Sequence, residues 1–267
     1  MAGFSLGIGV SVAHRRRRPS YDPFAAAYFG TFQAEPGAAY KRLMSDYTTA
    51  LQDEGIWPKL DLVFDIGAMD ATGWARNWKD PDQFMLAAVN GPTIVPRYGA
   101  TGDGSTMCLE APWTPFANGQ EFALNDASIW MASPANVASA QPAVGAGQSY
   151  VVAINPRSAS DNGICQLNSV SGSPPAYAGV TSSVGFWGAQ LFDGNQLRMT
   201  RDGIALGPDL TKAAEGRPTG RLRALGRTPS SYTTLPVRMM AVGGSVIGKE
   251  QVFAAAWKAL ADGMAAL

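Results

Sequence analysis

The sequence predicts a mainly β protein, an antiparallel sandwich or barrel with a helix at each end of the β region. Two observations predict it. Between Phe84 and Val242, short apolar runs alternate with turn-forming pairs such as Asn90-Gly91 and Asp193-Gly194, which permit the positive φ angles of tight hairpins. The 267-residue chain also has only 16% charged residues, with 30 Gly and 18 Pro, which argues against a coiled coil or a helical bundle.

The first segment of the chain has the pattern of a strand. Residues 3–12 alternate strictly between large apolar side chains and Gly or Ser. The apolar face consists of Phe4, Leu6, Ile8, Val10 and Val12. The glycines on the opposite face leave room for another backbone to pack closely. This segment is therefore either an ordinary edge strand of the same domain or an arm that adds to the sheet of a neighbouring subunit.

A basic block separates this strand from the rest of the chain. Arg15, Arg16, Arg17 and Arg18 are consecutive, and charges this close repel one another and stay solvated. The block is either a solvated linker or a contact with an acidic neighbouring protein or packaged nucleic acid. Residues 21–36 follow as a loop-like segment whose aromatic side chains indicate that it lies against something. We interpret residues 1–36 as an arm for attachment or oligomerisation, with these five apolar residues and four arginines as its attachment residues.

Two amphipathic helices are expected in residues 37–267, which we predict to form a single domain. The first spans residues 37–54 and ends at Gly55, and the second spans residues 249–261 and is ended by Gly263. Their apolar faces are Tyr40, Leu43, Met44, Tyr47 and Leu51 in the first, and Val252, Phe253, Ala256, Trp257 and Leu260 in the second. Each helix must bury its apolar stripe, so both are expected to pack on one antiparallel sandwich.

The sequence predicts the surroundings of three aspartates and three tryptophans. Residues 61–67 alternate as a strand, so Asp61 and Asp65 are expected to face solvent, opposite Leu62, Phe64 and Ile66. Asp70 is expected to cap a short helical turn. The spacing of three tryptophans predicts that they fill one sandwich core: Trp130, Trp187 and Trp257.

Several segments share motifs with a set of phage proteins. They are DLVFDIGAMD at 61–70, NWK at 77–79, AVNGPT at 88–93, YGATGDGST at 98–106, LNDAS at 124–128 and VGGSVIGKEQ at 242–251. In this order, over roughly residues 37–267, the chain resembles bacteriophage virion structural proteins that carry a concanavalin A-like, laminin-G-like jelly-roll domain. The resemblance implies a jelly-roll sandwich, manufacture in the host bacterial cytoplasm and a surface-exposed place in the virion. It does not extend to residues 1–36.

The residues make no case for catalysis. The single histidine, His14, lies beside the arginine block, which argues against a Ser-His-Asp site, a Cys-His site or a histidine metal site in the sandwich. The glutamates are scattered singly, without the Glu-x-Asp-x-x-Glu pattern of jelly-roll glucanases. Residues 99–104 lack the Lys-Ser/Thr ending of a phosphate-binding loop. We therefore predict no enzyme and no cofactor.

The sequence also gives little support for a metal site, a disulfide, nucleic-acid binding or membrane insertion. Asp103, Asp126, Asp161 and Asp193 could offer oxygen ligands to calcium, but each is better explained as a turn residue, so no metal is predicted. The two cysteines, Cys108 and Cys165, are expected to be free thiols. Lys plus Arg and Asp plus Glu both number 21, which gives no general case for nucleic-acid binding. Apolar runs stay under about ten residues against the roughly 20 of a membrane span, so no membrane insertion is expected.

Three classes of function remain. The leading hypothesis is a structural component of a phage or phage-like particle, such as a capsid decoration, head fibre or tail protein. It would attach to other virion proteins by its N-terminal arm and contact host-surface polysaccharide through jelly-roll loops. We expect a homo-oligomer, with three copies favoured by analogy with phage fibres and spikes. The alternatives are a free carbohydrate-binding lectin, which would not need an arm, and a glycosidase that degrades polysaccharide.

Overall fold

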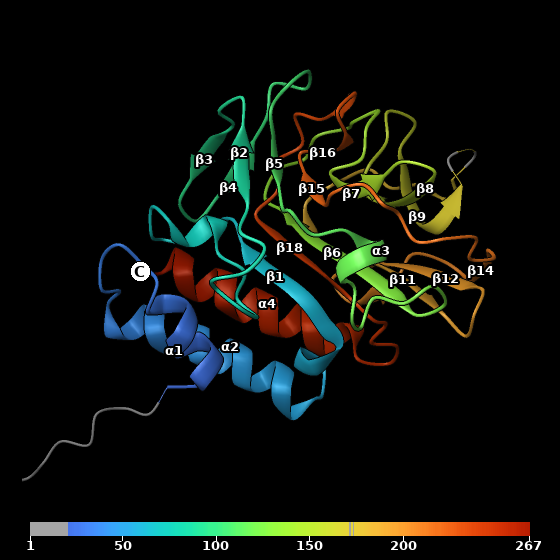
Figure 1. The fold of residues 1–267 in the computed structure, drawn as a ribbon. Coiled ribbons are helices and arrows are strands. Elements are labelled where there is room, and N and C mark those ends of the chain that lie inside the picture. Colours follow the sequence, from blue (N-terminus) through green and yellow to red (C-terminus); the bar gives the residue numbers. More distant parts are fainter. Residues whose placement is uncertain (1–20, 171, 173) are drawn as a thin grey trace, which may run out of the picture.

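The computed structural model describes residues 21–170, 172 and 174–267, and within them the chain forms two antiparallel sheets and a helical layer (Figure 1). Sheet A has the strand order β1-β18-β6-β11-β12-β13, with β14 also paired to β12. Its strands are β1 (Leu60–Asp65), β18 (Met239–Gly243), β6 (Ala127–Ser133), β11 (Gly185–Phe192), β12 (Gln196–Arg201), β13 (Ile204–Ala205) and β14 (Leu210–Thr211). The predicted antiparallel sandwich is confirmed.

Sheet B has the strand order β10-β9-β8-β7-β15-β5-β2. Its strands are β10 (Ala176–Ala178), β9 (Asn162–Val170), β8 (Tyr150–Asn155), β7 (Val144–Gly147), β15 (Arg223–Ala224), β5 (Cys108–Glu110) and β2 (Ala87–Val89). Two small hairpins complete the strands: β3 (Thr93–Val95) with β4 (Gly99–Thr101), and β16 (Gly226–Thr228) with β17 (Ser231–Tyr232). Asp193-Gly194 joins β11 to β12 with positive φ at both residues, which is the hairpin geometry that the sequence predicts.

The helices lie together on one side of the molecule, against sheet A (Figure 1). These helices are α1 (Pro23–Phe29), α2 (Ala38–Asp53) and α4 (Glu250–Ala265). The loops contain a short helix, α3 (Pro115–Asn118), and two 3-10 turns, η1 (Trp57–Lys59) and η2 (Gly73–Ala75). None of the described helices is both long and apolar enough to cross a membrane. The expected packing of both amphipathic helices on a single sandwich is confirmed.

Two hydrophobic cores result from this layering. The first lies between the sheets and includes Trp187, while the second lies between sheet A and the helices and includes Trp130 and Trp257. The prediction that these three tryptophans fill one core is therefore wrong, although all three are buried. The physical reason is that sheet A is covered on both faces, so successive residues of β6 all face an apolar layer.

The helical layer begins earlier and ends later than predicted. Residues 23–29, expected as loop, form α1, which buries Tyr28 beside Trp78 with ring centroids 4.6 Å apart. The N-cap residue Asp22 accepts hydrogen bonds from the backbone N–H groups of Phe24 and Ala25. At the other end, α4 continues through Gly263 to Ala265, and a Cβ at position 263 would stand 2.4 Å from Leu43 of α2. The segment at 21–36 therefore packs on the sandwich, as its aromatic content indicated.

The aspartates of β1 differ from the expectation that both face solvent. Asp65 is fully buried beneath the helical layer, where the Gly67 N–H and the Tyr40 hydroxyl lie near its carboxylate, but neither oxygen accepts a hydrogen bond of normal geometry from the described residues. Burial raises its pKa to about 7, although the nearby positive charge of Arg238 opposes this rise. Asp61 is partly buried and accepts hydrogen bonds from the backbone of residues 120–122. The N-cap residue of η2 is Thr72 rather than the predicted Asp70, which lies two residues earlier and accepts from the backbone N–H groups of Thr72 and Gly73.

Candidate functional site

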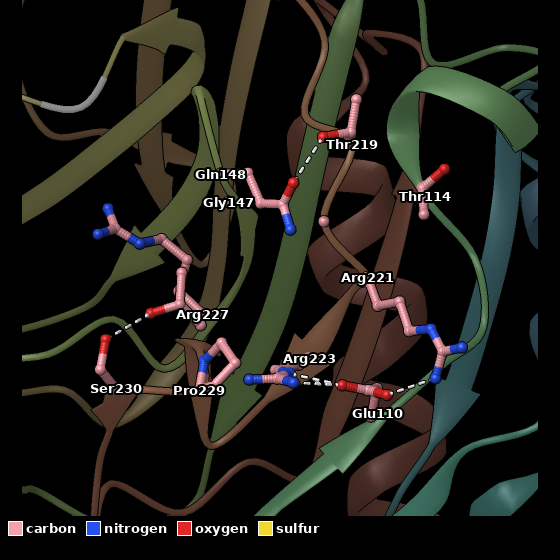
Figure 2. A pocket seen from close by; sticks show the side chains of 12 residues that line it. Glu110, Thr114, Gly147, Gln148, Thr219, Arg221, Arg223, Arg227, Pro229 and Ser230 are labelled. Atoms are coloured by element: carbon pink, nitrogen blue, oxygen red, sulfur yellow. Dashed lines mark hydrogen bonds and ion pairs between the residues drawn. The ribbon is translucent and has the colours of Figure 1, made fainter.

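The outer face of sheet B carries a hollow of about 700 Å³, on the side of the sandwich opposite the helices. We call it the arginine hollow. It is lined by Glu110, Thr114, Gly147, Gln148, Thr219, Gly220, Arg221, Arg223, Arg227, Thr228, Pro229 and Ser230 (Figure 2). Its residues come from β5, β7, β15, β16 and neighbouring loops, so segments more than 100 residues apart in the chain meet there.

Strand alternation places the charged side chains of the hollow on the outer face. On β5, Leu109 belongs to the core between the sheets, whereas Glu110, the next residue, lines the hollow. On β15, Ala224 belongs to the same core, so Arg223 faces outward. Glu110 and Arg223 are direct partners in the antiparallel ladder, which brings their side chains together.

Glu110 is held by two arginines. Its Oε1 accepts a hydrogen bond from Arg221 Nη1 at 2.8 Å, and its Oε2 accepts from Arg223 Nε at 2.8 Å and also from Arg223 Nη2. Burial alone would raise the pKa of Glu110, but these hydrogen bonds outweigh it, and the pKa lies below its ordinary value. Glu110 is therefore an ionised anchor for two guanidinium groups.

The third arginine has a different environment. Arg227 makes no ion pair or hydrogen bond from its side chain within the described residues, and its Nε is buried without a partner. Its stem lies over two glycines of β7, since a Cβ on Gly145 or Gly147 would meet Arg227 side-chain carbons at 3.2 to 3.4 Å. Figure 2 shows Arg227 on the opposite side of the hollow from Arg221, with Arg223 and Glu110 between them. Burial lowers the pKa of Arg227 below its ordinary value, but an arginine stays protonated at neutral pH.

Neutral polar groups complete the lining. Thr219 Oγ1 and Gln148 Oε1 are 3.1 Å apart in a hydrogen bond that turns the amide nitrogen of Gln148 toward the hollow (Figure 2). At the rim, α3 starts directly after the lining residue Thr114, and the N–H of Phe116 donates to the carbonyl of Pro218, beside Thr219. Phe116 is 58% exposed, with the Arg217 guanidinium 5.7 Å from its ring centroid. The lining of the hollow thus combines cations, hydroxyls and an amide.

A second hollow, of about 600 Å³, lies between α4 and sheet A and has a different character. The charges of its lining residues balance, because two side chains are basic, Arg238 and Lys258, and two are acidic, Asp202 and Asp262. The arginine hollow instead has three guanidinium groups and one carboxylate. An excess of charge in a concave site attracts ligands of opposite sign, so the arginine hollow is the stronger candidate for a binding site.

The structure does not describe the site residues that the sequence predicted. Phe4, Leu6, Ile8, Val10, Val12 and Arg15 to Arg18 all lie outside the described residues, and so does His14. Among the described residues no group of three or more potential metal ligands is present. Asp103 instead accepts from the backbone N–H groups of residues 105–107, and Asp161 and Asp193 occupy positive-φ turn positions. Cys108 and Cys165 are buried free thiols, as expected.

The sequence reasoning missed the arginine hollow. One local signal was available: residues 221–227 read RLRALGR, in which Arg221 and Arg223 alternate with the core residues Leu222 and Ala224. That period places two arginines on one outer face. Nothing in the sequence indicated that Glu110 would lie opposite them, because this pairing spans more than 100 residues.

The fold resembles that of solved structures of Trypanosoma rangeli sialidase. A mutant of this sialidase displaying trans-sialidase activity matches with a TM-score of 0.53 and 10% identity, over 82% of this chain and 39% of that chain. The same sialidase in complex with sialic acid matches with a TM-score of 0.52 and 12% identity, over 80% of this chain and 38% of that chain. This chain therefore spans well under half of the sialidase chains, and at these identities the likeness is one of fold alone.

A third match covers nearly a whole smaller unit. Domain 4 of AbnA, an extracellular arabinanase from Geobacillus stearothermophilus solved with arabinotriose, aligns at a TM-score of 0.40 and 13% identity, over 73% of this chain and 97% of that chain. The chain matches no protein-family model and no curated protein. Its two antiparallel sheets with flanking helices define a concanavalin A-like β-sandwich.

Proposed function

We propose that the chain is a non-catalytic, surface-exposed component of a bacteriophage or phage-like particle, and that its sandwich contacts host-surface glycans through the arginine hollow. The observation that carries the binding role is the asymmetry of the sandwich. Helices cover the outer face of sheet A, whereas the outer face of sheet B bears a polar hollow with unused hydrogen-bond donors. The particle role is supported by the sequence motifs that resemble phage virion proteins.

The absence of catalysis in this proposal is supported by the chemistry of the hollow. Hydrolysis of a glycosidic bond by the usual route needs a pair of carboxyl groups, one of them protonated. The hollow has one carboxylate, Glu110, and its hydrogen bonds to two arginines hold its pKa below the ordinary value. Such a group stays ionised at neutral pH and is a poor proton donor.

In this proposal the N-terminal arm attaches the chain to the particle. The position of α1 decides which residues a truncation can remove without unfolding the sandwich. Removing residues 1–36 would also remove α1, whose Tyr28 is fully buried. Removing residues 1–20 leaves α1 and its cap Asp22 in place. A chain without residues 1–20 is expected to melt at the temperature of the full chain and to be missing from purified particles.

Two other outcomes of that experiment contradict parts of the proposal. If the truncated chain is incorporated normally, the arm is not the attachment device. If the full chain is never found in particles but binds polysaccharide in solution, the chain is a free lectin.

In the same proposal the chain assembles as a homo-oligomer, with three copies favoured by analogy with phage fibres. Sedimentation of the isolated full chain as a monomer would contradict self-assembly without a particle partner.

A further inference from the structure

We infer that the arginine hollow selects acidic glycans, binding a carboxylate or sulfate group of a sugar between Arg223 and Arg227. This inference rests on the proposed glycan-binding function and names the class of ligand. Its first support is the charge of the site. The lining holds three guanidinium groups and one carboxylate, and the remaining lining residues are neutral. An uncompensated positive charge in a concave site favours an anion over a neutral sugar.

The second support is the state of the hydrogen-bond donors. Glu110 uses both of its oxygens on Arg221 and Arg223. Arg223 Nη1 and Arg227 Nε are nevertheless buried and have no partner among the described residues. Buried donors of this kind are normally satisfied. An anionic oxygen in the hollow would accept hydrogen bonds from the guanidinium groups of these two lining arginines, and bonds of this type are stronger than those between neutral groups.

The third support is that the site is already ordered. Arg223 is fixed by its hydrogen bonds to Glu110, and its side chain is only 14% exposed. The stem of Arg227 lies on Gly145 and Gly147, where any larger residue would displace it. Side chains that are already ordered lose less conformational entropy on binding. The two glycines of β7 therefore act as a platform for the cation.

The fourth support identifies a sugar as the carrier of the anion. Thr114, Thr219 and Gln148 offer hydroxyl and amide groups beside the arginines, which suit the hydroxyls of a sugar ring. A bare phosphate-binding site would not need these groups.

The test compares probes that differ only in charge. Oligogalacturonate is titrated into the full chain by calorimetry at low salt, against the same oligosaccharide with its carboxyl groups methyl-esterified. Dextran sulfate is compared with dextran to distinguish sulfate from carboxylate recognition. The expected result is binding of at least one acidic probe, with its neutral counterpart at least about tenfold weaker, because charge-assisted hydrogen bonds are lost.

Two variants locate the binding in the hollow. R227Q is expected to weaken the acidic probe about tenfold or more, since it removes the unpaired guanidinium. The matched control is R42Q, because Arg42 is exposed on α2, on the opposite side of the sandwich, and its removal makes the same change in net charge. R42Q is expected to leave the affinity unchanged. If R227Q fails to fold, R227K replaces it and is expected to weaken binding while retaining the charge.

The outcomes separate this inference from the proposed function. Equal binding of acidic and neutral probes would overturn the selectivity for anions but leave glycan binding standing. Equal loss in R227Q and R42Q would overturn the location. Failure of every probe to bind a folded chain would contradict both the inference and the proposed function. A single-stranded DNA oligonucleotide that binds as tightly as the acidic glycan, with the same loss in R227Q, would show a general polyanion site and overturn the assignment to a sugar.

Discussion

Glu110 on β5 and Arg223 on β15 face each other directly across the antiparallel ladder of sheet B, with Glu110 Oε2 accepting from Arg223 Nε at 2.8 Å. This one pairing fixes the arginine hollow in two ways. It orders Arg223, and it uses the only carboxylate among the described lining residues, so that Arg227 is left without an acidic partner among them. The same pair ties together segments that lie 113 residues apart in the sequence.

Replacing Glu110 with Gln should therefore destabilise the chain. The glutamine removes the charge that pairs with both Arg221 and Arg223, and Arg223 is largely buried. We expect the free energy of unfolding to fall by about 1–3 kcal/mol, measured by urea unfolding. The matched control is Asp262→Asn, whose exposed pair with Lys258 is expected to matter by less than about 0.5 kcal/mol. Equal effects of the two variants would show that the Glu110 cluster contributes no more than a surface ion pair.

Asp65 predicts a pH dependence of stability. Burial raises its pKa in the folded chain to about 7, above the 3.8 of an unperturbed aspartate. Between about pH 4 and 7 the folded chain holds a proton that the unfolded chain has released, so this group makes stability fall as pH rises. The charged neighbour is Arg238, and the surrounding Tyr28, Tyr40 and Tyr47 are neutral in this range.

The variant Asp65→Asn isolates this effect because it cannot ionise. The difference in unfolding free energy between variant and parent, measured in urea at pH 5 and pH 8, should shift in favour of the variant at the higher pH. The shift should be on the order of a few kcal/mol, with most of it complete near pH 7. Parallel pH profiles for the two proteins would mean that Asp65 has an ordinary pKa in the folded chain.

A larger residue at Gly188 of β11 is expected to disturb the packing of the second core. It lies opposite Trp130 of β6, and a Cβ at this position would stand 2.1 Å from the tryptophan ring. Gly188→Ala should therefore displace the ring and lower the free energy of unfolding by about 1–3 kcal/mol. Gly207→Ala is the control, because its Cβ would make only ordinary contacts at 3.4 Å or more, and it should change stability by less than about 0.5 kcal/mol. Equal stability of the two variants would show that Trp130 can repack freely.

The arm predicts a loss of attachment without a loss of folding. Leu6, Ile8 and Val10 lie outside the described residues, and their replacement by Asp should abolish incorporation into particles, because a charged face cannot pair against a partner's apolar surface. The melting temperature should not change. The matched control places Asp at three exposed apolar positions of the sandwich, Val95, Val170 and Ile204, and should still be incorporated. Unfolding of the whole domain by the arm variant would identify residues 3–12 as an internal strand.

The arginines of the arm make a separate prediction. Serine at positions 15–18 should weaken attachment mainly at raised salt, because the charges are expected to orient the arm rather than to supply most of its affinity. Particle occupancy, measured over a series of salt concentrations, distinguishes this from a uniform loss. A loss that is the same at every salt concentration would contradict the electrostatic role.

Local patterns in the sequence determined much of the secondary structure. The one-sided apolar periods predict α2 and α4 to within a few residues, and Asp193-Gly194 predicts the hairpin between β11 and β12. These succeed because helix periodicity and the positive φ of a tight turn are properties of neighbouring residues. The composition, poor in charge and rich in Gly, likewise indicates the mainly β class.

Tertiary structure alone decided the layers and the site. The helices cover sheet A, so Asp65 is buried rather than exposed and Trp130 lies in a different core from Trp187. Gly263 does not end α4, and its lack of a side chain leaves room for Leu43 of α2. The arginine hollow joins Glu110, Gly147 and Arg223, which no local pattern connects. The physical reason is that strand alternation determines only which face a residue occupies, whereas the pairing of distant strands determines what that face meets.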